Sequence, residues 1–192
     1  MNTILMRLPC SNEWKICLEN KDFFYSLPAI FSKFGIGLIY TPYIDKTVYG
    51  AVRWIDNKPL IQISDRNKSL AVCLHTLFHE IGHVLLHEHD DVFDGCIYEN
   101  KSKHQKKEQE ANQYAYEQLY NGDSLRKYIF QIKNIKKNTP SLYDADFIGD
   151  TACKFGISPM FVAYWMKRSQ ILSIHINKHI PKIDFNEVIS VT

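Results

Sequence analysis

The chain has 192 residues, of which 45% are hydrophobic and 13% are aromatic. This size and composition indicate one compact domain with an apolar core, and they exclude a wholly disordered chain. The formal net charge of +2 also argues against a protein whose main task is to bind nucleic acid or an acidic membrane surface.

Cysteine use and hydropathy indicate where the protein works. The five cysteines are odd in number and widely scattered, and no two form a CxxC pair, so a thiolate zinc knuckle is not expected. Reduced thiols of this kind are typical of cytoplasmic proteins. No apolar run is long enough to span a bilayer, and the N-terminus lacks the sustained apolar stretch of a secretory signal. We therefore expect a cytoplasmic protein with no membrane association.

The first third of the chain predicts a helix and then a small sheet. Apolar residues recur at roughly helical spacing over residues 12–34, although Pro28 lies inside that stretch. The sequence Asp56-Asn57-Lys58-Pro59 predicts a hairpin turn between two strands. Three runs rich in β-branched and aromatic residues each predict a strand, at residues 37–40, 48–55 and 60–64.

The remainder of the chain predicts mainly helices. A broad apolar stripe indicates a long helix that starts at a cap residue, Ser64 or Asp65, and runs to about residue 87. The polar stretch 89–107 is expected to be mostly loop, and the last twenty residues carry no clear pattern. Further helices are predicted at residues 107–120, where Asn121-Gly122 provides the stop, and at 125–137, 145–155 and 159–169.

The strongest functional signal is the sequence His79-Glu80-Ile81-Gly82-His83 on the long helix. Two histidines four residues apart lie about 6 Å apart along a helix axis and differ by about 40° in direction, so both imidazoles can reach one metal ion. Zinc suits imidazole ligands, and Glu80 is placed to activate a metal-bound water without binding the metal itself. Gly82 costs helix stability, which indicates a close approach by another element.

Two further histidines, His75 and His87, extend the same stripe along the helix. Residues eight apart are about 12 Å apart along the axis, so only one adjacent pair can bind one ion. Only the pair His79 and His83 has a carboxylate at the next position. His87 therefore either supports the site from behind or is simply exposed.

A catalytic zinc site needs a third protein ligand and leaves one position for water. The next predicted helix opens with Glu108-Gln109-Glu110-Ala111-Asn112. Glu110 borders the apolar face that begins at Ala111, so it can point inward when the helix packs. Glu108 and Glu117 are alternatives, and the spacing alone leaves the choice open.

Several segments, taken in order, resemble the ImmA/IrrE family of small zinc metallopeptidases. Together they cover about residues 35–170. One departure is residues 118–122, where the family usually has an apolar segment that ends near a proline. The similar segments are residues 50–54 and 58–63 for the paired strands, 77–87 for the active-site helix, 110–115 for the second signature, which begins Glu110-Ala111-Asn112, and 155–159 with Val162 for the C-terminal helices.

The resemblance implies an α+β, zincin-like fold with a small twisted β-sheet, an HExxH active-site helix and a C-terminal helical, helix-turn-helix-like subdomain. It implies a Zn²⁺ ion held by His79, His83 and Glu110, with Glu80 as the catalytic base of an endopeptidase. Members of the family typically cleave helix-turn-helix repressors, so the expected partner is such a repressor or an antitoxin, with no direct nucleic-acid binding. We expect the metallopeptidase core at residues 1–122 and the helical subdomain at 123–192.

Two other functions stay open at this point. Ala152, Gly156 and Val162 have the spacing of a helix-turn-helix, which would suit a DNA-binding regulator, but the second helix lacks side chains that read base edges. The other alternative is a protein that keeps its metal and binds a partner without cutting it. The sequence does not identify the group that stabilises the oxyanion; the candidates are Tyr49, Arg53, Tyr114 and His87.

Overall fold

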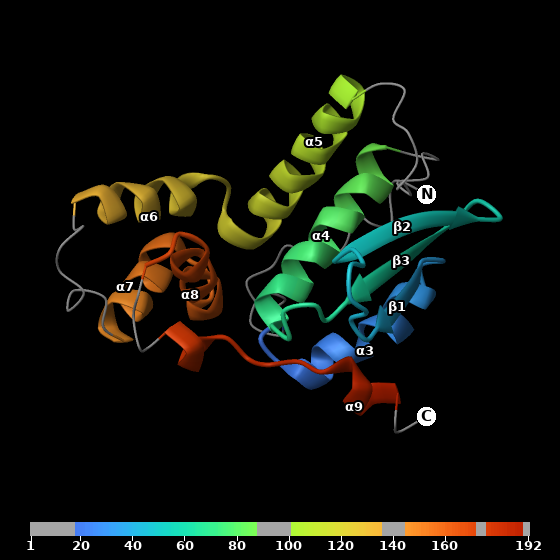
Figure 1. Ribbon diagram of the computed structural model, residues 1–192, viewed down its shortest axis with the longest axis horizontal. Helices are drawn as coiled ribbons and strands as arrows, with labels where there is room; N and C mark the ends of the chain where they lie inside the picture. Colours follow the sequence, from blue (N-terminus) through green and yellow to red (C-terminus); the bar gives the residue numbers. More distant parts are fainter. Residues whose placement is uncertain (1–17, 88–100, 136–144, 172–175, 190–192) are drawn as a thin grey trace.

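The computed structural model describes residues 18–87, 101–135, 145–171 and 176–189, which form a mixed α+β fold. A small sheet lies at one end, the two long helices α4 and α5 lie side by side in the middle, and a group of shorter helices lies at the other end (Figure 1). This confirms the α+β class with a small sheet. Within the described part of the chain, no helix is long and apolar enough to cross a membrane.

The first described helix, α3, spans Lys21–Ser32 and begins at the side-chain cap of Asn20. It lies inside the predicted stretch, of which residues 12–17 are outside the described residues. Pro28 is accommodated without ending the helix. A proline has no N–H for the carbonyl four residues earlier, and here that carbonyl, on Phe24, accepts a hydrogen bond from the Tyr40 hydroxyl at 2.6 Å. The strand residue thus satisfies the acceptor that Pro28 leaves free.

The sheet contains β1 (Gly37–Thr41), β2 (Gly50–Ile55) and β3 (Lys58–Ser64) in the order β1-β3-β2. β1 runs parallel to β3 and β2 runs antiparallel to it, so β2 is an edge strand. The predicted hairpin is confirmed: Asp56 and Asn57 both have positive φ angles, of 48° and 60°, as a two-residue hairpin turn requires.

The long helix α4 spans Leu70–Leu86 and packs on β2 and β3. Its start differs from the predicted cap at Ser64 or Asp65. Ser64 is the last residue of β3, and the buried Asp65 carboxylate accepts backbone N–H groups from Tyr43, at 2.7 Å, and Phe185, at 2.9 Å. A carboxylate that joins two distant segments is not available to cap a helix.

Helix α5 spans Lys101–Tyr120 and crosses α4 closely. The helix begins within residues 89–107, which were predicted to be mostly loop. Lysine, glutamine and glutamate are good helix formers, so this segment can be helical without an apolar face. Residues 88–100 lie outside the described residues. The predicted stop is confirmed by positive φ angles of 52° at Asn121 and 80° at Gly122.

Three helices follow close to their predicted positions: α6 (Ser124–Ile135), α7 (Ala145–Phe155) and α8 (Pro159–Arg168). Residues Met160–Met166 of α8 are all buried, and α8 contacts both α4 and α6. The chain then returns through η2 (Ile176–His179) to α9 (Phe185–Ile189), which lies beside the sheet end of the molecule (Figure 1). The division at residue 122 stays a prediction, although Phe185 stacks on Tyr40 of β1.

The crossing of α4 and α5 depends on Gly82. A Cβ atom added there would lie 3.0 Å from the Ala111 Cα, 3.2 Å from the Ala111 carbonyl oxygen and 3.3 Å from the Tyr114 Cβ. Two of these atoms are backbone, so the clash could be relieved only by moving α5 as a whole. The close approach inferred from a helical glycine is therefore present, and it is made by α5.

We expect Gly82→Ala to lower the free energy of unfolding by about 1–2 kcal/mol, because overpacking at the crossing outweighs the gain in helix propensity. Gly149→Ala is the matched control, since Gly149 also lies inside a helix but has no atom within 4 Å of an added Cβ; it should stabilise the protein by up to about 1 kcal/mol. Chemical denaturation measures both. Equal stabilisation by the two changes would contradict a tight crossing.

Candidate metal centre

Helix α4 brings the two histidines of the HExxH sequence together. One helical turn separates His79 from His83, and their Nε2 atoms lie 3.0 Å apart. The His83 side chain is 1% exposed and the His79 side chain 17% exposed. Both rings therefore meet at the interface between α4 and α5, where water has little access.

The carboxylate that joins them comes from Glu108 on α5. One of its oxygens lies 3.3 Å from His79 Nε2 and the other lies 3.2 Å from His83 Nε2. Among the described residues, these three side chains form the one group whose ligand atoms all lie within 4.8 Å of one another. The structure thus brings Glu108 into the position for which the sequence favoured Glu110.

Helix periodicity explains this difference of two residues. Ala111 and Ala115 are fully buried against α4, and Glu108 precedes them by three and seven residues, which places it on the same face of the helix. Glu110 lies about 100° around the axis from Ala111. Bordering an apolar face in sequence was the weaker criterion, because neighbouring residues on a helix do not point the same way.

The three groups fit a divalent metal ion. In a tetrahedral site with ligands at 2.0–2.1 Å, the ligand atoms lie about 3.3–3.4 Å from one another. The two Nε2 atoms lie 3.0 Å apart, and each lies 3.2–3.3 Å from a different oxygen of the Glu108 carboxylate, so the separations come close to those edges. Two imidazole nitrogens and one carboxylate oxygen are a donor set of the kind that catalytic sites use, with a fourth position left for water.

The electrostatics of the cluster favour a negatively charged carboxylate between two rings. Hydrogen bonds with His79 and His83 hold the pKa of the Glu108 carboxyl well below its usual range. Burial lowers the pKa of His83 and keeps that ring neutral, whereas for His79 the partnership with Glu108 outweighs burial and raises the pKa. A deprotonated carboxylate and a neutral imidazole are the forms that bind metal.

Behind the cluster, His87 and Glu110 form a chain of contacts. His83 Nδ1 lies 3.1 Å from His87 Nδ1, and His87 Nε2 lies 2.9 Å from a Glu110 carboxylate oxygen. If His83 Nε2 binds a metal, its proton must sit on Nδ1 and is donated to His87, whose own Nε2–H is then donated to Glu110. His87 is 7% exposed, so it supports the site from behind and is not a surface residue.

Glu80 lies next to the cluster but does not belong to it. It is 5% exposed, and burial raises the pKa of its carboxyl to about 7. A bound cation would lower that pKa again, because positive charge favours the carboxylate. A Cβ on Gly50, at the start of β2, would lie 2.5 Å from Thr76 Cγ2 and 2.8 Å from Glu80 Oε1. The absence of a side chain at Gly50 is thus what gives Glu80 its place under the edge strand.

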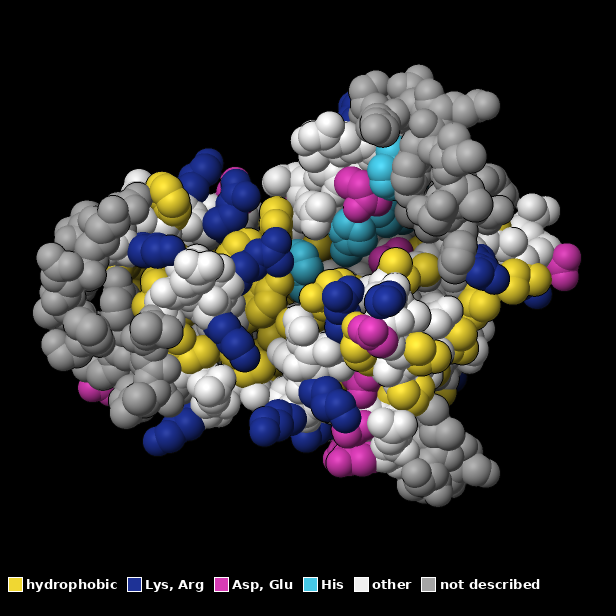
Figure 2. Space-filling view, viewed as in Figure 1, with side chains coloured by type: hydrophobic (Ala, Val, Ile, Leu, Met, Phe, Trp, Pro, Cys, Tyr) yellow, Lys and Arg dark blue, Asp and Glu magenta, His cyan; other side chains and the backbone are white. Residues whose placement is uncertain are grey.

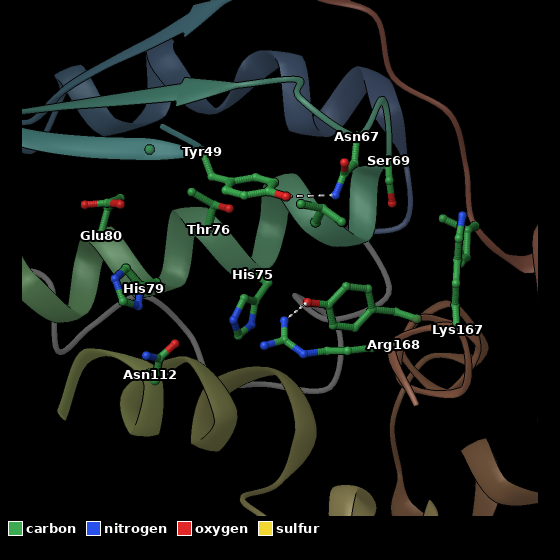
Figure 3. Close-up of a pocket in the computed structure, with 14 residues that line it drawn as sticks. Tyr49, Asn67, Ser69, His75, Thr76, His79, Glu80, Asn112, Lys167 and Arg168 are labelled. Atoms are coloured by element: carbon green, nitrogen blue, oxygen red, sulfur yellow. Dashed lines mark hydrogen bonds between the residues drawn. The ribbon is translucent and has the colours of Figure 1, made fainter. Parts of the chain in front are cut away.

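A cleft of about 710 Å³ opens beside the cluster. His79 and Glu80 lie at one end, β2 and α5 form its sides, and α8 closes the other end (Figure 3). In the space-filling view, histidine side chains lie at the bottom of a recess in this face (Figure 2). The lining residues are Tyr49, Gly50, Asn67, Ser69, Val72, His75, Thr76, His79, Glu80, Asn112, Tyr164, Lys167, Arg168 and Ile180.

Of the four candidates for the oxyanion-stabilising group, Tyr49 lines the cleft, whereas Arg53, Tyr114 and His87 do not. His75 lines it one turn away from His79 and is held near the Tyr120 hydroxyl, at 3.2 Å, while burial lowers its pKa to about 3. The sequence indicated that the C-terminal helices pack on the catalytic part and shape a groove, but it did not single out Tyr164, Lys167 and Arg168, which α8 contributes to the lining. Those residues reach the cleft only through the packing of distant segments, for which the sequence carries no local signal.

We expect Glu108→Ala to abolish tight metal binding, because two imidazoles alone cannot complete the site. Glu110→Ala should weaken binding by about 10–100-fold, as expected for loss of a group that orients a ligand. Titration of the metal-free protein with Zn²⁺ measures both, and Glu117→Ala, at an exposed acidic position on the same helix, serves as the control. Loss of binding in Glu110→Ala with retention in Glu108→Ala would reverse the assignment.

Comparison with known families agrees with this geometry. The family model for Peptidase_M78, described as the IrrE N-terminal-like domain, matches residues 31–167. Comparisons with curated proteins and with solved structures give no match. The matched range contains the three clustered side chains, Glu80 and nearly all of the cleft. Because the match spans more than half of the chain, the protein belongs to the Peptidase_M78 family of peptidases, with an IrrE N-terminal-like domain.

Proposed function

We propose that the protein is a zinc-dependent endopeptidase whose metal is held by His79, His83 and Glu108. The observation that carries the proposal is the convergence of three ligand groups from two helices, with one ligand atom of each within 4.8 Å of the others and the buried carboxylate of Glu80 beside them. The family supports peptidase chemistry. The proposed metal is zinc because two imidazoles and one carboxylate, with a fourth position left for water, are a donor set of catalytic zinc sites in metallopeptidases.

The roles of the protein groups follow from their positions. A zinc ion held by His79, His83 and Glu108 would supply Lewis acidity toward a peptide carbonyl and would acidify a nearby water molecule. The Glu80 carboxylate is placed to accept a proton from the water that attacks the carbonyl carbon. The same carboxyl then donates the proton to the amide nitrogen as the C–N bond breaks. Burial keeps Glu80 oriented, and its position one residue after His79 leaves it beside the cluster and outside it.

The edge strand offers a track for the substrate backbone. Among the described residues, β2 pairs with β3 on one side only, and its first residue, Gly50, lines the cleft next to Thr76 and Glu80. An extended peptide can add to such an edge through main-chain hydrogen bonds. We propose that the scissile segment lies along the start of β2 in this way, which brings its carbonyl to the metal end of the cleft.

The proposed partner is a helix-turn-helix repressor or an antitoxin in the cytoplasm, and this part rests on the family resemblance. DNA binding by the protein itself is the less favoured function. Helix α8 is buried from Met160 to Met166, so it lacks the exposed face that a recognition helix inserts into the major groove. Its exposed positive residues, Lys167 and Arg168, lie at its end and line the cleft.

Glu80→Gln should keep the fold and the zinc while the rate of peptide cleavage falls by roughly 10²–10⁴, because the amide cannot accept a proton. Zinc content, thermal unfolding and single-turnover cleavage of a protein substrate test this. The variant should still bind the substrate and so can trap an unknown partner. Loss of zinc would make Glu80 a ligand, and retained biological activity with retained zinc would favour a binding protein that does not cut.

Gly50→Ala should slow cleavage by about 10–100-fold while zinc binding is retained, because the new methyl displaces Glu80 and small displacements of a catalytic group are costly. The double change Gly50→Ala with Thr76→Ser removes the clash with Thr76 Cγ2 and leaves the clash with Glu80. Compared with Gly50→Ala alone, the double variant should therefore be more stable to unfolding, but its rate of peptide cleavage should stay low. Full recovery of the rate in the double variant would show that Glu80 had not moved.

A further inference from the structure

The end of the cleft far from the metal is positively charged. Arg168 and Lys167, the last two residues of α8, both line it. In Figure 3 the Arg168 guanidinium lies beside His75, on the side of α4 that also carries His79. The C-terminal part from residue 121 contains ten lysines and arginines against six aspartates and glutamates, so positive charge predominates in it.

The arginine is held in place by aromatic groups and not by an acidic residue. Its Nη1 donates a hydrogen bond to the Tyr164 hydroxyl at 3.0 Å, and its guanidinium lies 5.4 Å from the centre of the Trp165 ring. Within the described parts of the chain, no carboxylate forms an ion pair with Arg168 or Lys167. A guanidinium with a fixed direction and donors still available is suited to bind a planar carboxylate in a bidentate manner.

The side of the cleft next to Arg168 is formed by uncharged aromatic rings around His75. The His75 ring lies 5.6–6.0 Å, centre to centre, from the rings of Tyr116, Tyr120 and Tyr164. Burial keeps His75 neutral. Of these rings, His75 and Tyr164 line the cleft between the metal end and Arg168, so the first strong charge that a bound peptide meets there is the guanidinium.

The distance suits a peptide that spans the cleft. His75 lies one helical turn, about 6 Å, from His79, and the ring of Tyr164, which holds Arg168, is centred 6.0 Å from the His75 ring. An extended peptide advances about 3.3–3.6 Å per residue. A group that reaches the guanidinium would thus sit roughly two to four residues from the bond being cut.

We propose that Arg168, assisted by Lys167, forms a specificity subsite for a carboxylate of the peptide substrate, two to four residues from the scissile bond. The inference rests on the proposed endopeptidase function and adds a substrate class to it, peptides with an acidic group at that position. The carboxylate can belong to an Asp or Glu side chain or to the C-terminus of the substrate. Both present the same planar anion, and the experiment separates them.

The test begins with cleavage of a peptide library, produced from a proteome by chymotrypsin, by the zinc-loaded protein, with mass spectrometry to locate the cut sites. Matched synthetic peptides are then made from the best substrate. One pair replaces the acidic residue by its amide, and the other replaces a free C-terminus by a C-terminal amide. Wild-type protein should cut the carboxylate-bearing member of one pair with kcat/KM about 10–100-fold above its partner.

Arg168→Glu should remove that preference and favour a peptide with lysine at the same position. Lys127→Glu makes the same charge change at an exposed position on α6 outside the cleft, and it should keep the wild-type preference. Arg168→Gln, with zinc content and thermal midpoint measured alongside, guards against a folding defect caused by the reversed charge.

The outcomes distinguish a failure of the subsite proposal from a failure of the endopeptidase proposal. Cleavage without any acidic preference, or a preference that survives in Arg168→Glu and Arg168→Gln, overturns the subsite while the endopeptidase stands. If wild-type protein and Glu80→Gln give the same library without cuts, the endopeptidase function fails and the subsite falls with it.

Discussion

The close crossing of α4 and α5 is the constraint on which the site depends. His79 and His83 are fixed by helix geometry alone, but their third partner is delivered by another helix whose position is set where Gly82 meets the backbone of Ala111. Ala111 and Ala115 are buried at this contact, and Glu108 lies on the same face one turn earlier. A shift of α5 by the width of a methyl group would move Glu108 by a comparable amount. A change that disturbs the packing of α5 on α4 at Gly82 should therefore also lower the affinity for a metal ion.

The buried groups at this crossing also explain why a cation belongs there. Without one, two Nε2 atoms and a carboxylate converge at 3.0–3.3 Å, and protons must lie between them to prevent three acceptors from facing one another. A divalent ion at the centre would remove the need for such a proton; the Nδ1–H of His83 would then be donated to His87, and the Nε2–H of His87 to Glu110. Binding a metal thus releases protons and sets a single hydrogen-bonding direction through the chain. Glu110 is half-exposed at the end of that chain, where a negative charge costs little.

The features that the sequence predicted are those that local rules determine. The hairpin follows from two residues that tolerate positive φ, the end of α5 from Asn121-Gly122, and the convergence of His79 and His83 from their spacing on one helix. The position of Glu108 could have been predicted from the small residues Ala111 and Ala115, since the face of a helix that packs closest carries its smallest side chains. The cap of α4 could not, because Asp65 is drawn away by Phe185, a residue 120 positions later in the chain. The α8 side of the cleft likewise depends on contacts between distant segments.

The two ends of the cleft carry different charged groups, and this difference would favour one direction of a bound peptide over the other. Carboxylates and imidazoles gather at the metal end, and the guanidinium of Arg168 stands at the other, with neutral rings between them. A backbone added to the edge of β2 gains main-chain hydrogen bonds that are similar for many sequences, so these contacts hold a substrate without selecting it. Selection must come from side-chain subsites. Because α8 is buried along most of its length, its last turn can hold Arg168 at a set distance from the cluster of His79, His83 and Glu108, as the proposed subsite requires.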